Sequence, residues 1–170
     1  MSQNRQFSQR LDAWQDELRN QIITPFMPVA FSGCTAEARL SPREAAELPF
    51  IPVSPGDRWG MHREYRWFRA DVTLPEEIVG KRIVLLSGLG GEQLVCLDGR
   101  PVGAVDREHP YVTLFPAARS FTLLIESYAG NGPRLESLGP CPPERDPLPP
   151  VTSPQCEIRE SSLALWNEDA

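Results

Sequence analysis

The sequence is poor in lysine and histidine and contains no long apolar run. Its 170 residues include 17 basic residues, of which only Lys81 is a lysine, against 23 acidic ones, so the formal net charge is −6. Binding to nucleic acid needs a basic face that neutralises phosphates, so a nucleic-acid partner is not expected. No apolar run approaches the ~20 residues of a membrane-spanning helix, so we expect no membrane association.

The N-terminal residues 2–6 are polar and lack the apolar core of a secretion signal. None of the cysteines belongs to a C-x-x-C pair, and the two histidines have no second ligand at metal-binding spacing, so a structural zinc site in this sequence is not expected. We therefore predict reduced thiols in a cytoplasmic protein. The cysteines are Cys34, Cys96, Cys141 and Cys156, and Cys96 lies in an apolar run typical of a buried strand.

Several catalytic signatures are also missing. There is no Gly-x-Ser-x-Gly elbow, and neither His62 nor His109 has the neighbours of a catalytic triad. Residues 88–91, Gly-Leu-Gly-Gly, could suggest a phosphate-binding loop, but a strand rather than a helix is expected to follow, which favours a turn. The acidic residues that could act as a glycosidase pair are scattered, and they are Glu64, Glu92, Asp98 and Asp106.

Two helices are predicted. In residues 6–23 one apolar stripe recurs at helical spacing, and it consists of Phe7, Leu11, Trp14, Leu18 and Ile22. In residues 41–48, Ser41 can be the N-cap, Pro42 the first helical residue and Glu44 the acid of a capping box.

From Tyr65 onward the pattern is that of strands with turns between them. Asp98-Gly99 is a strong hairpin signal, because both central positions of the tight turn need positive φ. The spacing favours an all-β sandwich over alternating β-α units. The expected strands are 65–74, 82–87, 92–97, 100–105, 111–115 and 120–128.

The chain is expected to divide at changes of composition into 1–55, a helical segment and loop, 56–139, the β-sandwich core, and 140–170. The last part opens with a proline-rich strap and ends in a final strand that we expect to pack back on the sandwich. Its apolar residues Leu163, Leu165 and Trp166 also suit a contact with a segment further along the polypeptide.

Aromatic residues in the loops are the candidate binding groups, because aromatic faces stack on sugars and sandwich loops commonly carry binding residues. Trp67 lies beside Phe68 and is better explained as a core residue, and Trp59 could instead anchor a neighbouring domain. The candidate carbohydrate-binding residues are Trp59, His62, Asp106 and His109.

The order of these features resembles one family. A helix with Leu11, Trp14 and Leu18 precedes Gly56-Asp57-Arg58-Trp59-Gly60, Trp67-Phe68-Arg69, Gly91-Glu92-Gln93-Leu94-Val95, Asp98-Gly99, Ile125-Glu126 and Gly139-Pro140-Cys141-Pro142-Pro143. Over roughly residues 7–166 the sequence resembles the N-terminal domain of class II α-mannosidases, glycoside hydrolase family 38. The resemblance implies a mostly β, jelly-roll (galactose-binding-like) β-sandwich preceded by an N-terminal helical segment, with a catalytic domain following.

The resemblance carries no catalytic residue into this chain. The family's catalytic domain holds zinc through His and Asp ligands, and its signature begins with His-x-Asp, whereas His62 is followed by Arg63-Glu64 and His109 by Pro110-Tyr111. The implied role is a noncatalytic accessory domain that packs on a mannosidase catalytic domain, in the same gene product or an adjacent subunit. Zinc is expected in that missing domain and no cofactor in this chain, and homo-oligomers are possible.

Two alternatives remain open. The chain could be a free-standing carbohydrate-binding module that uses Trp59, His109 and Asp106. It could also be a glycosidase in its own right, with acids that the sequence does not reveal.

Overall fold

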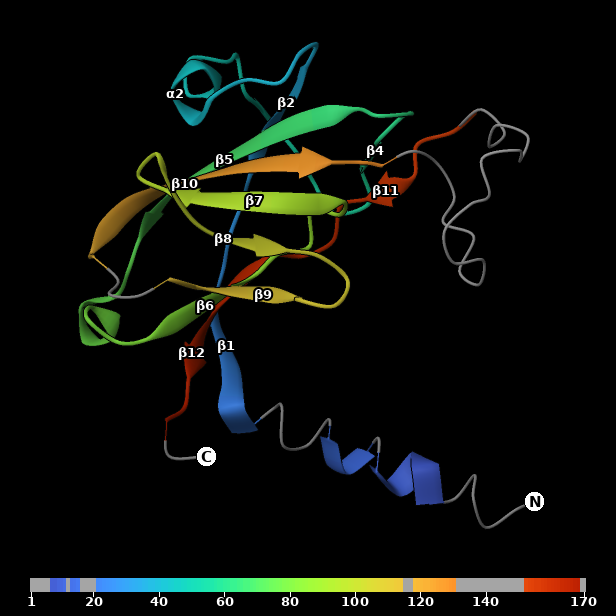
Figure 1. The fold of residues 1–170 in the computed structure, drawn as a ribbon. Helices are drawn as coiled ribbons and strands as arrows, with labels where there is room; N and C mark the ends of the chain where they lie inside the picture. The colour runs from blue at the N-terminus through green and yellow to red at the C-terminus, as the bar shows by residue number, and fades with distance from the viewer. Residues whose placement is uncertain (1–6, 12, 16–20, 115–117, 131–151, 169–170) are drawn as a thin grey trace.

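A computed structural model describes residues 7–11, 13–15, 21–114, 118–130 and 152–168. Two antiparallel sheets face each other, and the expected mostly β jelly-roll sandwich is confirmed (Figure 1). The strands predicted from Tyr65 onward are present as β5 to β10.

The larger sheet has six strands in the order β3-β2-β5-β10-β7-β8, all antiparallel. Its centre is the nine-residue pair β5 and β10, which stay in register from Tyr65↔Tyr128 to Thr73↔Ser120. The strands are β2 (Ser32–Ala36), β3 (Ile51–Pro52), β5 (Tyr65–Thr73), β7 (Glu92–Leu97), β8 (Arg100–Val105) and β10 (Ser120–Tyr128).

The smaller sheet has the order β1-β12-β6-β9. Its strands are β1 (Ile23–Pro28), β6 (Ile83–Leu86), β9 (Tyr111–Leu114) and β12 (Ser162–Trp166). β12 lies between β1 and β6, so it completes this sheet, and Leu163 is fully buried. Beside the sheets, β4 (Arg58–Trp59) pairs with β11 (Cys156–Glu157), and a 3-10 turn, η1, spans Glu76–Ile78.

The main core fills the space between the two sheets. In β10 the alternate residues Phe121, Leu123 and Ile125 point into it, while Leu124 and Glu126 point to the other face of the sheet. The largest side chains buried there include Phe68, Leu74, Ile83, Leu85, Leu89 and Leu114.

A second, smaller core lies on the outer face of the six-stranded sheet, where the short helix α2 (Pro42–Ala45) covers it. The capping box is present as predicted, with Ser41 and Glu44 each bonding the other's backbone N–H. The helix ends at Ala45, earlier than the expected 48, and residues 46–48 continue as turns. Ala45 packs in a cluster with Trp67, Cys96 and Leu124, which confirms the core positions expected for Trp67 and Cys96.

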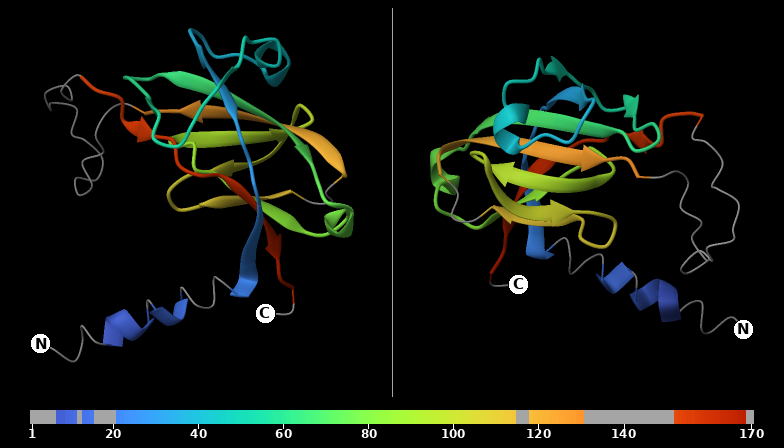
Figure 2. Two further views of the ribbon diagram at one scale, coloured as in Figure 1. Left: turned by 180° about the vertical axis from the view of Figure 1, so that it is seen from behind. Right: turned by 45° about the horizontal axis from the view of Figure 1, so that its top comes forward.

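The first helix is described in part. Residues 7–11, 13–15 and 21–22 are helical, and Figure 2 shows them extending away from the sandwich. Leu18 lies outside the described residues. Phe7, Leu11 and Trp14 are 66%, 40% and 60% exposed and Ile22 is half-buried, so the first three residues of the predicted apolar stripe are not covered. The helix gives way to β1 at Ile23, and β1, β2 and β3 place part of residues 1–55 inside the two sheets.

Candidate functional site

The loop between β8 and β9 carries two of the predicted residues, and the structure brings them together. Asp106 Oδ1 accepts hydrogen bonds from the backbone N–H groups of Glu108 (2.8 Å) and His109 (2.7 Å) and lies 3.1 Å from Nδ1 of the His109 ring. These bonds, the backbone one from His109 foremost, lower the pKa of Asp106 below its usual value. The pair is therefore a preformed, exposed polar group.

A hollow of about 740 Å³ lies beside this loop, and His109 contributes to its lining. Tyr111 and Trp166 also line it, with ring centroids 5.9 Å apart, and the Arg82 guanidinium lies 4.3 Å from the centre of the Trp166 ring. Tyr111 and Trp166 are thus the aromatic side chains that line this hollow together with His109.

His62 is exposed in the turn between β4 and β5. This turn and the β8–β9 loop leave the same end of the six-stranded sheet, but β10 and β7 lie between β5 and β8. At a strand spacing of ~4.8 Å, β5 and β8 are about 14 Å apart. The structure therefore does not group His62 with Asp106 and His109.

Trp59 occupies a different environment from the one expected of a sugar-stacking residue. It is 2% exposed, its indole Nε1 donates to the carbonyl oxygen of Leu89 (2.8 Å), and its ring packs edge-on to Phe68 at 5.7 Å. An indole needs a hydrogen-bond partner when it is buried, and the 88–91 turn supplies one. Trp59 offers no exposed ring face in this chain, which corrects the expectation of a loop aromatic open to ligand.

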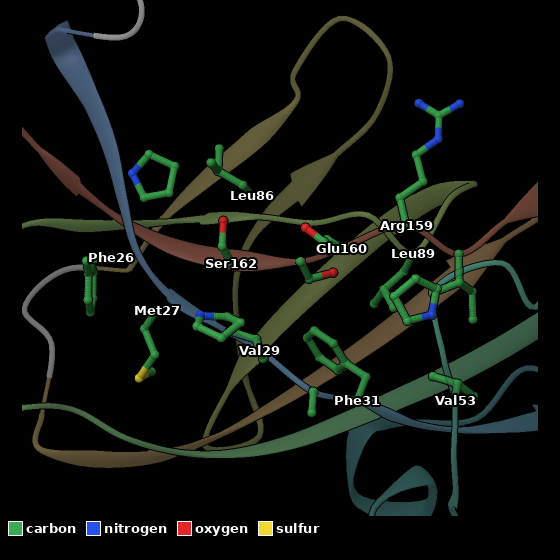
Figure 3. Close-up of a pocket in the computed structure, with 16 residues that line it drawn as sticks. Phe26, Met27, Val29, Phe31, Val53, Leu86, Leu89, Arg159, Glu160 and Ser162 are labelled. Carbon is green, nitrogen blue, oxygen red and sulfur yellow. The ribbon is translucent and has the colours of Figure 1, made fainter.

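Another hollow, of about 780 Å³, follows the segment that crosses from β1 to β2. Figure 3 shows Phe26, Met27 and Phe31 on one side of it and Leu86, Leu89 and Ser162 on the other, with the guanidinium of Arg159 extending outward. Its lining is largely apolar. It contains no cluster of catalytic groups.

The sequence did not single out Glu126 as a candidate, although it is buried at 8% exposure on the outer face of the six-stranded sheet. It lines a pocket of about 390 Å³ together with Trp67 and Arg39. The available signal was an acid that directly follows the apolar run Leu123–Ile125, at the alternate position that shares a face with Leu124.

A family comparison assigns this fold. The sequence model of a family described as "Alpha-mannosidase, jelly roll domain" matches residues 25–144. The chain belongs to this α-mannosidase jelly-roll family.

Two similar proteins of mammals are also named as α-mannosidases. Alpha-mannosidase 2C1 of Mus musculus is 32% identical over 159 residues, which cover 89% of this chain and 15% of the mouse protein. Alpha-mannosidase 2C1 of Homo sapiens is 36% identical over 92 residues, which cover 54% of this chain and 9% of the human protein. The chain thus spans a small part of the length of these α-mannosidases.

Solved structures of other glycosidases share the fold at low identity. A β-glucuronidase of Faecalibacterium prausnitzii matches with a TM-score of 0.53 and 17% identity, over 88% of this chain and 32% of the other. A β-glucuronidase of Bifidobacterium dentium matches with a TM-score of 0.54 and 14% identity, over 87% and 30%. At this identity the likeness concerns the fold alone.

The family resemblance raises the question of zinc. Within the described ranges, no three His, Cys, Asp or Glu side chains are grouped so that they could hold a metal ion. The described part of the jelly-roll domain therefore does not fit a zinc site, and Cys141 lies outside it. In the same residues no helix is long and apolar enough to span a membrane.

Proposed function

We propose that this chain is the noncatalytic N-terminal accessory domain of a zinc-dependent α-mannosidase, packing on the catalytic domain and aiding its assembly. The observation that carries the proposal is the family match over residues 25–144, together with relatives named as α-mannosidases that are much longer than this chain. The hydrolysis of α-mannosides and the zinc belong, on this proposal, to the catalytic domain.

The exposed helical stripe supports a docking role. Large apolar side chains that are exposed together mark interaction surfaces. Phe7, Leu11 and Trp14 form such a group, because all three are exposed and recur at helical spacing. Of the C-terminal apolar residues, Leu163 is fully buried in β12, and Leu165 and Trp166 are half-buried, so they offer a smaller docking surface than the helix.

The test is complementation. A family α-mannosidase from which the jelly-roll domain has been deleted is mixed with this chain, and hydrolysis of an aryl α-mannoside is measured with added zinc. We expect the chain alone to be inactive and the mixture to be more active and more stable than the deleted enzyme alone. Activity of the chain by itself would instead favour the glycosidase alternative.

Variants locate the contact. Replacement of Phe7, Leu11 and Trp14 by Ser should weaken the complex. Ile51→Ser is the control, because Ile51 is 63% exposed on β3, far from the helix in sequence. Equal complementation by the two variants would argue against docking through the helix.

Carbohydrate binding by the β8–β9 loop is a second proposal, supported by the exposed Asp106–His109 pair beside Tyr111 and Trp166. Asp106→Asn should then weaken the binding of a glycan found by array screening, and a screen without any ligand would count against it.

A cytoplasmic location stays a proposal too, supported by Cys34, Cys96 and Cys156 being free thiols.

A further inference from the structure

The outer face of the six-stranded sheet contains a pocket that none of the proposals above uses. It lies between the segment leading into α2 and strands β5, β7 and β10, and it has a volume of about 390 Å³. A hollow of about 240 Å³ shares Arg39, Leu94 and Glu126 with it and adds Tyr65 and Tyr128. The first pocket alone falls in the range of about 300–1,000 Å³ typical of small-molecule sites.

Two buried polar side chains of this pocket have no hydrogen-bond partner. They are Trp67, 0% exposed, through Nε1, and Glu126, 8% exposed, through Oε1. The two residues are direct cross-strand neighbours on β5 and β10. Among the described residues the other buried side-chain atoms without a partner are Arg66 Nε and Ser127 Oγ, whose residues line neither hollow.

Such a pair is costly for a domain to keep. Buried donors and acceptors nearly always have a hydrogen-bond partner. A group without one loses the free energy of its hydration and gains no hydrogen bond in return. Burial raises the pKa of Glu126, and the charge of Arg39 only partly opposes that rise. A stable fold would more simply place an apolar residue at this position, as it does at Leu124 and Leu94 beside it.

The chemistry of the pocket defines its ligand. The indole N–H can only donate, the Glu126 carboxylate can accept, and the exposed Arg39 at the rim supplies further donors. A hydroxyl group both donates and accepts. Because Trp67 Nε1 and Glu126 Oε1 are both buried, a small shift of the lining side chains must accompany binding, after which neighbouring hydroxyls of one molecule can satisfy Trp67 and Glu126 together. The negative charge of Glu126 disfavours phosphates and other anions.

Two tyrosines in the adjoining hollow narrow the chemical class of ligand that fits the pocket. Tyr65 and Tyr128 are stacked with their ring centroids 4.8 Å apart and an angle of 30° between the rings. Aromatic side chains beside convergent polar groups form the mixed lining that suits a sugar, which has apolar C–H faces and polar hydroxyl edges. A peptide amide also donates and accepts, but hollows of about 390 and 240 Å³ suit a single sugar ring better than an extended peptide.

We propose that this pocket is a binding site for a neutral monosaccharide or the terminal sugar of a glycan, held by Glu126, Trp67 and Arg39. The site is separate from the Asp106–His109 loop. It is also independent of the accessory role, because a domain can bind sugar whether or not it docks on a catalytic domain.

The test uses the 170-residue chain and two-dimensional ¹H–¹⁵N NMR, in which the indole N–H of Trp67 gives its own signal. D-mannose and D-glucose are titrated separately. We expect the Trp67 signal to move saturably with at least one sugar, while that of the exposed Trp14 stays in place. Glu126→Gln should weaken the binding about tenfold, because it replaces a hydrogen bond to a charged carboxylate by a weaker one to a neutral amide.

Two further variants control for folding and location. Arg39→Ser changes an exposed rim residue and should weaken binding without affecting the fold. Asp71→Asn removes an acid from the same sheet outside the pocket and should leave binding unchanged.

The proposal fails if neither sugar moves the Trp67 signal, or if Glu126→Gln and Asp71→Asn bind equally well. Saturation of the same signal by N-acetylglycine amide, with no effect of either sugar, would assign the pocket to peptides and overturn the sugar assignment. Loss of mannosidase complementation would not bear on this result, nor would this result bear on complementation.

Discussion

At the scale of single residues, Trp59 belongs to the main core of the domain. It follows Asp57-Arg58 and precedes a glycine, a context that suggests an exposed loop. In the fold it is held in β4 by pairing with β11, and its ring closes one end of the core. Its contribution is therefore to stability.

Substitution of Trp59 should lower the free energy of unfolding. Trp59→Phe removes the bond to Leu89 and should cost about 1–2 kcal/mol, and Trp59→Ala should cost about 3–5 kcal/mol. Urea unfolding measures both. Trp14→Ala is the matched control, expected to change stability by less than ~0.5 kcal/mol because Trp14 is exposed. Equal effects of Trp59→Ala and Trp14→Ala would contradict the buried position.

Glu126 should give the fold a characteristic pH dependence. Its pKa in the folded chain is raised above the ordinary 4.5, mainly by burial. As pH rises past 4.5 the unfolded chain releases this proton first, so the folded state loses stability until its own Glu126 ionises.

Urea unfolding at a series of pH values tests this. Relative to Glu126→Gln, the wild-type chain should be less stable above this range than below it. The comparison isolates Glu126 from Asp71 and Asp106, whose lowered pKa values act in the opposite direction. A difference between the two proteins that does not vary with pH would show that Glu126 does not titrate abnormally.

At the scale of elements, the 88–91 turn connects β6 to the segment that leads into β12 through hydrogen bonds. Gly88 N–H donates to Ser161 Oγ (2.9 Å), and its carbonyl accepts from Arg159 N–H (2.7 Å). These hydrogen bonds hold segment 158–161, which leads into β12, against the end of β6. It is followed by β7, a strand, as the sequence predicted.

Gly88 should tolerate no side chain. A Cβ there would lie 2.4 Å from the carbonyl oxygen of Glu160 and 2.6 Å from that of Arg159, so Gly88→Ala should destabilise the fold by about 3 kcal/mol. Gly80→Ala is the control, because its Cβ would meet nothing within 4 Å and only the positive φ of 79° is strained, at about 1 kcal/mol. Thermal unfolding compares them, and the reverse order would refute the close packing.

At the scale of the whole molecule, the sandwich depends on its last strand. β12 forms the interior of the four-stranded sheet with β1 on one side and β6 on the other. The family match ends at residue 144, so the strand that completes the sheet lies beyond it.

Truncation after residue 151 should therefore abolish cooperative unfolding, because β1 would lose its partner in the sheet and the core would lose Leu163. A chain of residues 21–170 should keep a sharp transition, since Phe7, Leu11 and Trp14 contribute little buried area. Circular dichroism during heating distinguishes the two. A sharp transition in the truncated chain 1–151 would mean that β12 is dispensable.

Much of this architecture follows from the sequence through local rules. The pattern of strands separated by turns predicted β5 and β10, and the Asp98-Gly99 turn is confirmed with φ values of 49° and 77°. The capping box at Ser41 was equally readable, because N-cap chemistry depends on residues close in the chain. β1 was not predicted because it contains Pro25 and Pro28, and proline is rare in strands, although it is tolerated in an edge strand such as β1.

The sequence by itself determined the strand segments from Tyr65 to Tyr128, the tight turn, the capped helix and the α-mannosidase family, because each depends on neighbouring residues or on their order. Only the tertiary structure decided that Trp59 is buried, that Asp106 and His109 are separated from His62, and that Glu126 and Trp67 share a pocket. The reason is that antiparallel pairing sets residues far apart in sequence side by side, and register alone fixes which of them meet.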